Sequence, residues 1–280
     1  MDVMDAFKAV VMGAVEGLTE FLPISSTGHL IVTGELLGFM HAPADQEFRH
    51  LFEIVIQLGA ILAVIGLFRQ RFWQVLKTLH TSAASRAFVI KLGVAFVPAG
   101  IIGLTTHTFV EAHLMNTGVV TVVLALGGLA IILIERRKPQ EPRHVDAMNL
   151  PWGIAIAIGC CQCVSLVLPG TSRAAATILG GVLLGLDRRT ATEFSFFLAI
   201  PTMCAATGYS LLKHREGLAD PRMGLLLIGF VVSFIVAWIV IAWLLRFVAN
   251  NTFTVFGWYR IAAGLVLAGL LAAGVLSFGG

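Results

Sequence analysis

The chain has 280 residues, of which 58% are hydrophobic and only 12% are charged, and its mean hydropathy is +0.90. A soluble domain carries about twice this charged fraction, so the composition excludes a soluble globular protein and predicts an integral membrane protein. The formal net charge is only +3, and no nucleic-acid partner is predicted.

The first apolar region, residues 3–38, is interrupted near its middle by Pro23. Proline cannot continue a helix, and neither half of the region reaches the ~20 residues that a membrane crossing needs. We therefore expect a re-entrant helix pair, which enters and leaves the bilayer on the same side.

Three apolar segments that are long enough to cross a bilayer follow: about 48–68, 87–106 and 117–135. A second interrupted region, residues 151–186, is broken at Pro169 and is predicted to form another re-entrant pair. Three more crossings come after it: about 191–212, 222–248 and 256–277. The predicted fold is an all-α polytopic membrane protein with six transmembrane helices and two re-entrant helix pairs, in one integral membrane domain over residues 1–280.

Basic residues indicate the orientation of these segments. The connections 69–86 and 136–150 each carry four Lys or Arg residues, whereas 107–116 carries none. The positive-inside rule places the first two in the cytoplasm and the third outside, so the first helix pair enters from outside and the second from the cytoplasm. One group of basic residues would then lie outside, against the rule: Lys213, Arg215 and Arg222.

A short motif occurs twice with the same spacing, 146 residues apart: Gly13-x-x-Glu16 with Leu22-Pro23-x-Ser25-Ser26, then Gly159-x-x-Gln162 with Leu168-Pro169-x-Thr171-Ser172. Each copy is followed by three predicted crossings, and an odd number turns the second copy upside down. The halves of this inverted repeat cover about 1–138 and 149–280. We call the polar segment at each proline break an elbow: residues 16–29 in the first half and 169–177 in the second. The two elbows are expected to meet near the bilayer midplane.

The first elbow carries groups that suit phosphate chemistry. Glu16 and Glu20 are four residues apart and project from one face of a helix. They could orient a histidine, act as acid or base, or hold a divalent cation. Ser26 and His29 are spaced so that the imidazole can lie over the hydroxyl, which is the minimal nucleophile–base pair. Taken alone, the Ser-Ser-Thr cluster at 25–27 is only a helix cap.

The second elbow adds a permanent cation. Gly170 permits a tight turn, and Thr171 or Ser172 can cap the helix that follows. Arg173 offers a planar fork that fits phosphate oxygens, and the two helix N-termini favour an anion. An ion pair between Arg173 and Glu20 is the structural alternative.

These residues resemble a known family. Glu16-Gly17-Leu18-Thr19-Glu20 with Ser25-Ser26-Thr27-Gly28-His29, and Pro169-Gly170-Thr171-Ser172-Arg173 with Thr177, are similar to the two signatures of the bacterial undecaprenyl pyrophosphate phosphatases of the bacitracin-resistance type. The resemblance extends over nearly the whole chain. One position departs from the family pattern, because the serine that follows the arginine is Ala174 here. Alanine has no polar side-chain atom, so no side-chain hydrogen bond is expected from that position.

The resemblance implies release of phosphate from a C55 isoprenyl diphosphate lipid, which recycles the carrier lipid for cell-wall synthesis and confers bacitracin resistance. It also implies a location in the bacterial inner membrane, with the site open to the periplasmic side, and assistance by Mg²⁺ or Ca²⁺. A homodimer is left open. By motif match the catalytic residues are Ser26 as nucleophile, His29 as its partner or the nucleophile itself, and Glu16, Glu20 and Arg173. The phosphate-binding residues are Arg173, Ser172, Thr177, Gly170, Ser25 and Thr27, and the metal ligands are Glu16 and Glu20.

A transporter is the competing class of protein. Inverted repeats, broken helices and midmembrane carboxylates also suit a carrier of lipid phosphates or ions. A carrier does not need the Ser26–His29 pair, so this pair favours the enzyme.

Overall fold

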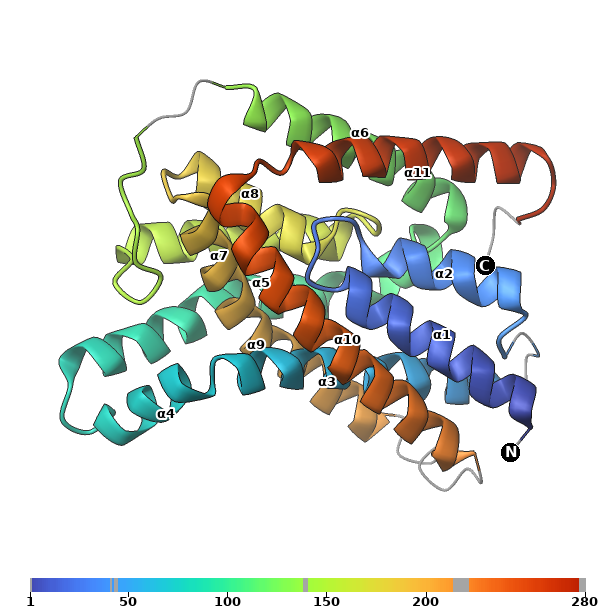
Figure 1. The fold of residues 1–280 in the computed structure, drawn as a ribbon, viewed down its shortest axis with the longest axis horizontal. Coiled ribbons are helices and arrows are strands. Elements are labelled where there is room, and N and C mark those ends of the chain that lie inside the picture. The colour runs from blue at the N-terminus through green and yellow to red at the C-terminus, as the bar shows by residue number, and fades with distance from the viewer. Residues whose placement is uncertain (1, 41, 43–44, 138–140, 214–221, 277–280) are drawn as a thin grey trace.

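The computed structural model describes residues 2–40, 42, 45–137, 141–213 and 222–276, and most of these residues are in helices (Figure 1). The helices of the described residues are α1 (Val3–Thr19), α2 (Ser26–Leu37), α3 (Gln46–Leu67), α4 (Arg69–Thr78), α5 (Ala83–His113), α6 (Thr117–Glu135), α7 (Trp152–Val167), α8 (Arg173–Leu183), α9 (Arg188–Lys213), α10 (Met223–Asn250) and α11 (Thr254–Ala272).

Six of these helices are long and apolar enough to cross a membrane: α3, α5, α6, α9, α10 and α11. The all-α fold with six crossings is therefore confirmed. Helices α1, α2, α7 and α8 have 17, 12, 16 and 11 residues, fewer than a crossing needs. The two interrupted regions thus form two pairs of short helices, as the prolines indicate.

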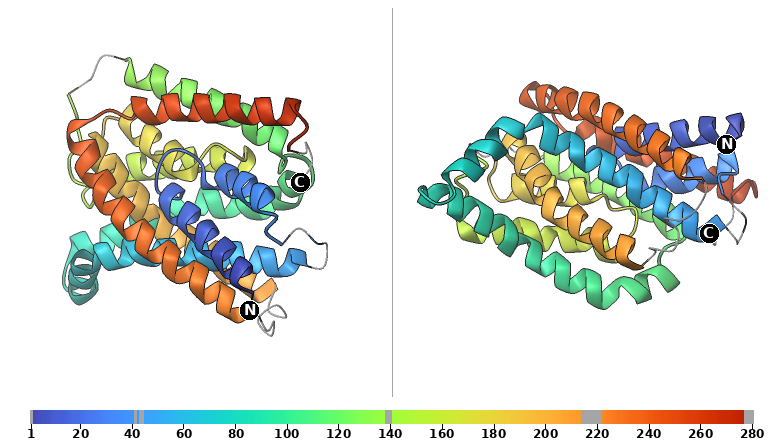
Figure 2. Two further views of the ribbon diagram at one scale, coloured as in Figure 1. Left: turned by 45° about the vertical axis from the view of Figure 1, so that its right-hand side comes forward. Right: turned by 90° about the horizontal axis from the view of Figure 1, so that it is seen from below.

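Helix α4 lies where the sequence predicted a loop. Its Trp73 and Leu76 are each 60% exposed, and the Lys77 ammonium lies 5.1 Å from the centre of the Trp73 ring. Such an amphipathic helix suits a membrane surface, and it carries three of the four basic residues of 69–86 that indicated a cytoplasmic connection, since Arg86 lies in α5. Helix α4 and its turn into α5 lie at the end of the molecule opposite the N-terminus (Figure 2, right). In the connection before α10, Arg222 pairs with Asp45, whereas Arg215 lies outside the described residues.

Close backbone contacts at glycines join α1 to α10 and α6 to α11. A Cβ added at Gly13 would lie 3.0 Å from the Cα of Gly229, so α1 and α10 approach each other as only glycines permit. Gly128 and Gly257 bring α6 and α11 together in the same way, and these two helices lie side by side in Figure 1. The pairing of small residues thus fixes α1 against α10 and α11 against α6.

The two elbows meet at the centre of the molecule. In Figure 1 the blue loop between α1 and α2 lies beside the yellow segment that joins α7 and α8. The Ser172 hydroxyl donates to the Leu22 carbonyl at 3.4 Å, which links one elbow to the other. Leu22 and Ile24 are buried in the same apolar cluster as Ile178 of α8.

The structure shifts the register of the sequence repeat by one residue at the elbows. Ser25 and Ser172 both have positive φ, 75° and 72°, and each side chain caps the helix that follows. The second elbow contains one more residue, at Gly170 with φ 93°, so the helices begin at Ser26 and at Arg173. Positive φ costs about 1–3 kcal/mol at a residue other than glycine, and such strain is typical of functional sites.

Candidate active site

Glu20 joins the two elbows. It directly follows α1, where its backbone N–H donates to the Glu16 carbonyl at 2.9 Å, and only 8% of the residue is exposed. The Ser26 hydroxyl donates to its Oε2 at 2.6 Å, and the Arg173 Nη2 donates to its Oε1 at 3.0 Å. The structure therefore brings the predicted nucleophile and the predicted phosphate-binding arginine to one carboxylate.

Ser26 is in a suitable setting for a nucleophile. It is the first residue of α2 and is partly exposed, so its hydroxyl can meet a substrate. A hydrogen bond of 2.6 Å to a carboxylate is a charge-assisted bond, and it places a proton acceptor on the hydroxyl that must lose its proton. The local arrangement is a hydroxyl paired with the Glu20 carboxylate, which is the arrangement that a nucleophile and its base require.

Arg173 keeps part of its donor capacity. Besides Glu20 it contacts the Ser195 carbonyl at 3.3 Å and the Met203 sulfur at 3.6 Å, and its guanidinium carbon lies 5.5 Å from the centre of the Phe21 ring. Its Nε is buried and has no hydrogen-bond partner. The Arg173–Glu20 ion pair that the sequence left open is formed, yet this arginine still has an N–H group for an anion.

His29 is not the partner of Ser26 in the described chain. Its Nδ1 lies 2.7 Å from the Ser25 carbonyl and its Nε2 lies 2.6 Å from the Tyr259 hydroxyl of α11. A carbonyl only accepts, so Nδ1 carries the proton and Nε2 of the neutral ring accepts from the tyrosine. The predicted contact between the imidazole and the Ser26 hydroxyl is therefore wrong, because Tyr259 holds the ring toward α11.

The remaining predicted residues shape the elbows. The Ser25 and Ser172 side chains accept from the backbone N–H groups of Gly28 and Ala175, at 3.5 and 3.2 Å. The fully buried Thr177 hydroxyl donates to the Arg173 carbonyl at 2.9 Å and lies 2.6 Å from the Ser195 hydroxyl.

Thr27, Gly170 and Ala174 are three further positions in the two motifs. Thr27 is exposed on α2, and Gly170 provides the turn of the second elbow. Ala174 is fully buried, so this position faces the core rather than a phosphate. The serine that the family pattern has here would therefore not reach a ligand from the same backbone position.

The sequence matches a family that is described as bacitracin resistance protein BacA, over residues 9–266. The chain belongs to this family. An "Undecaprenyl-diphosphatase 2" of Rhodospirillum rubrum is 48% identical over 279 residues, covering 99% of both chains. An "Undecaprenyl-diphosphatase" of Ectopseudomonas mendocina is 48% identical over 268 residues, covering 95% of this chain and 94% of that one. An "Undecaprenyl-diphosphatase" of Laribacter hongkongensis is 48% identical over 270 residues, covering 96% of each chain.

In this BacA protein, the carboxylates of the first elbow fit a cation only in part. Within the described residues, no group of three or more His, Cys, Asp or Glu side chains could hold a metal ion. Both oxygens of Glu20 already accept hydrogen bonds, but the Glu16 Oε2 is buried without a partner. A hard cation could therefore take Glu16 as one ligand and draw the others from phosphate oxygens and water, as Mg²⁺ commonly does.

Two residues of α11 belong to the site although the sequence analysis did not select them. Tyr259 holds His29, and Arg260 is fully buried against both elbows. An arginine inside a predicted crossing is costly unless it has partners, so Arg260 carried a signal of its own. The partners themselves lie far away along the chain, and no spacing rule connects them.

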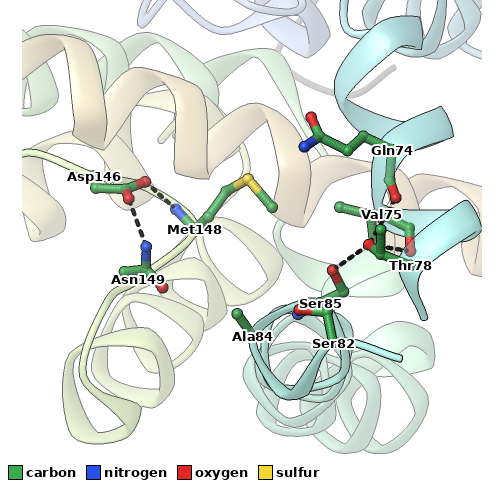
Figure 3. A pocket seen from close by; sticks show the side chains of 9 residues that line it. All are labelled: Gln74, Val75, Thr78, Ser82, Ala84, Ser85, Asp146, Met148 and Asn149. Atoms are coloured by element: carbon green, nitrogen blue, oxygen red, sulfur yellow. Dashed lines mark hydrogen bonds between the residues drawn. The ribbon is translucent and has the colours of Figure 1, made fainter. Parts of the chain in front are cut away.

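Two hollows in the described part of the chain differ in whether predicted site residues line them. A polar pocket of about 270 Å³ lies between α4, the start of α5 and the segment before α7, where Thr78, Ser85 and Asn149 line it (Figure 3). None of the predicted site residues lines that pocket. A hollow of about 160 Å³ begins at His29 and Tyr259 instead, and its other walls are mostly apolar: Gly28, Val32, Thr33, Leu124, Ala263, Val266 and Leu267.

Proposed function

We propose that this chain hydrolyses undecaprenyl diphosphate to undecaprenyl phosphate and inorganic phosphate. The single observation that carries the proposal is the chain of contacts from Ser26 through Glu20 to Arg173. The names of the relatives support the same substrate. The reaction recycles the carrier lipid for cell-wall synthesis, and renewed supply of that lipid confers bacitracin resistance.

The first step is attack by Ser26 on the terminal phosphorus. The hydroxyl proton passes to Glu20, whose Oε2 lies 2.6 Å away, and the Ser26 oxygen forms a bond to phosphorus. The bond between that phosphorus and the bridging oxygen breaks, and the electron pair leaves with undecaprenyl phosphate. Arg173 and the N-termini of α2 and α8 offset the charge on the phosphoryl oxygens.

The second step is hydrolysis of the phosphoserine. The oxygen of water bonds to the phosphorus, and the bond to the Ser26 oxygen breaks. Glu20 returns the proton from the first step to the Ser26 oxygen, and water loses one proton to solvent, which leaves inorganic phosphate and restores the Glu20 carboxylate. Glu16 is the carboxylate that would hold Mg²⁺ or Ca²⁺, because both oxygens of Glu20 already accept hydrogen bonds; such a cation, when bound, would neutralise charge on the diphosphate oxygens. This role uses the unpartnered oxygen of Glu16.

The lipid chain of the substrate leaves the site through the hollow between α2, α6 and α11. This hollow is mostly apolar and begins at His29, three residues after Ser26. We place the protein in the bacterial inner membrane, with α1–α2 and α7–α8 as re-entrant pairs of an inverted repeat and the site open to the periplasmic side. A homodimer is not required, because Ser26, Glu20 and Arg173 all come from one chain.

Phosphate release by the purified protein tests the proposal. In detergent, the wild type is expected to release one phosphate per undecaprenyl diphosphate and none from undecaprenyl phosphate. EDTA should slow the reaction, and Mg²⁺ or Ca²⁺ should restore it. A protein that binds the diphosphate lipid without releasing phosphate would instead be a carrier, the competing class of protein.

Tyr259→Phe is expected to lower kcat by about fivefold, because it removes one hydrogen bond to the Nε2 of His29 and leaves the ring stack in place. Tyr209→Phe is the matched control, since Tyr209 is exposed on α9 and lines neither hollow. The measurement is initial phosphate release from undecaprenyl diphosphate. Equal rates for both variants would show that the tyrosine hydroxyl does not serve the site.

A further inference from the structure

Arg260 of α11 is a second buried arginine beside the elbows, and all of its donors are occupied. The residue is 0% exposed. Its five N–H groups are matched by five backbone carbonyls at 2.8–3.3 Å: Leu124, Pro23, Thr171, Val123 and Gly170. A guanidinium has five donors in a rigid fork, so no donor is left over for a phosphate.

The carbonyls that Arg260 binds belong to both elbows. Nη1 donates to Pro23 of the first elbow at 3.3 Å and to Thr171 of the second at 2.8 Å, and Nη2 donates to Gly170 of the second at 2.9 Å. Nitrogen atoms of one planar group cannot move apart. The fork therefore sets the distance between the turn that precedes Ser26 and the turn that precedes Arg173.

These turns need such a donor. Pro23 and Gly170 lie between helices, where their carbonyls accept no hydrogen bond from the backbone of any described helix. An unsatisfied carbonyl inside a membrane protein costs folding free energy. An arginine inside a membrane is also expensive. Each satisfies the other, which explains how a charged side chain can be fully buried on a helix of crossing length.

Helix α6 is built to admit this side chain. A Cβ added at Gly127 would lie 2.8 Å from the guanidinium carbon of Arg260, and one added at Gly128 would lie 2.9 Å from its Cβ. These two glycines leave a channel through which the arginine reaches the elbows. The path of Arg260 to the elbows thus depends on the absence of side chains at these two positions of α6.

We infer that Arg260 is a positioning residue that locks the two elbows together, so that Ser26 and Arg173 address the same phosphate. The inference rests on the proposed function. It differs from a charge effect on the substrate, because Arg173 keeps an unpartnered Nε whereas every donor of Arg260 is used. Misplacement of reacting groups by about 1 Å can cost 10²-fold in rate, whereas substrate affinity depends mainly on contacts that remain.

Two variants test the positioning role of Arg260 in different ways. Arg260→Lys keeps the charge and loses the fork, and Gly127→Ala keeps the arginine and fills its channel. Each is expected to lower kcat by about 10²-fold, with KM for undecaprenyl diphosphate changed by less than about threefold. Orthovanadate, which mimics the transferring phosphoryl group, should bind less tightly in proportion to kcat, while a methylene-bridged isoprenyl diphosphonate should bind as in the wild type.

The controls separate positioning from general stability. Gly269→Ala adds a methyl group on α11 where nothing lies within 4 Å, and it should behave as the wild type. Arg188→Lys weakens a two-bonded pair with Glu135, which also accepts from the Phe253 N–H before α11, and it should lower the melting temperature with a much smaller fall in kcat than Arg260→Lys.

Each outcome supports or contradicts the proposed positioning role of Arg260. Normal kcat in Arg260→Lys or in Gly127→Ala would overturn it, and so would a parallel loss of diphosphonate and vanadate binding. Absence of any folded, monodisperse protein for both variants would also overturn it, because a positioning residue acts in a protein that stays assembled. An inactive wild type would instead contradict the proposed function.

Discussion

Replacement of Ser26 by alanine is expected to abolish phosphate release, with a fall in kcat of about 10⁴-fold or more. The hydroxyl is the atom that bonds to phosphorus, and Glu20 is then left with no proton to accept. Binding of the diphosphate lipid should remain close to that of the wild type, because Arg173 and both helix N-termini are still in place. Initial phosphate release and binding of a diphosphonate analogue measure the two effects separately.

The matched control is Ser165→Ala in α7, whose hydroxyl donates to the Gln162 carbonyl of its own helix. This variant should keep the wild-type rate. Acid-quenched wild type should contain phosphate on Ser26, detected by peptide mass spectrometry. Turnover of more than a few per cent in Ser26→Ala would exclude the serine as nucleophile and transfer that role to His29 or to water activated by Glu20.

Arg173→Lys is expected to lower kcat/KM by about 10²–10³-fold. A lysine can keep the ion pair with Glu20, so the fold should survive, but a single ammonium cannot reproduce the fork that also reaches Ser195 and that we propose binds the phosphate. Steady-state phosphate release measures the loss. The melting temperature of the purified protein reports whether the fold is retained.

Arg189→Lys provides the comparison for this loss. Arg189 also lies in the first turn of a helix and pairs with a carboxylate, that of Glu193, but its side chain is 63% exposed. Its replacement should leave activity unchanged, because an exposed ion pair contributes little. Equal and small effects of both lysine variants would show that Arg173 is a structural partner of Glu20 and not a ligand of the substrate.

Much of the fold could be predicted because its causes are local. Uninterrupted apolar length marks the six crossings, and α6 begins and ends where the sequence predicts. Pro23 and Pro169 mark the two breaks. Helix α4 was not predicted, because four basic residues in 69–86 indicate a connection equally well whether that connection is coiled or helical.

In the candidate site, too, the residue types could be predicted from local sequence, whereas their contacts could not. Motif and charge alone predicted that Ser26, Glu20 and Arg173 serve one phosphate chemistry, because a carboxylate and an arginine inside a membrane are costly without a partner or a function. The partner of each group was a matter of tertiary structure.

Only the fold decided that Glu20 rather than His29 takes the Ser26 hydrogen bond, and that Tyr259 and Arg260 support elbows more than 85 residues away in the sequence. The physical reason is that side chains within one helix turn are related by fixed geometry, whereas a hydrogen bond between helices exists only when packing brings its two atoms within about 3 Å.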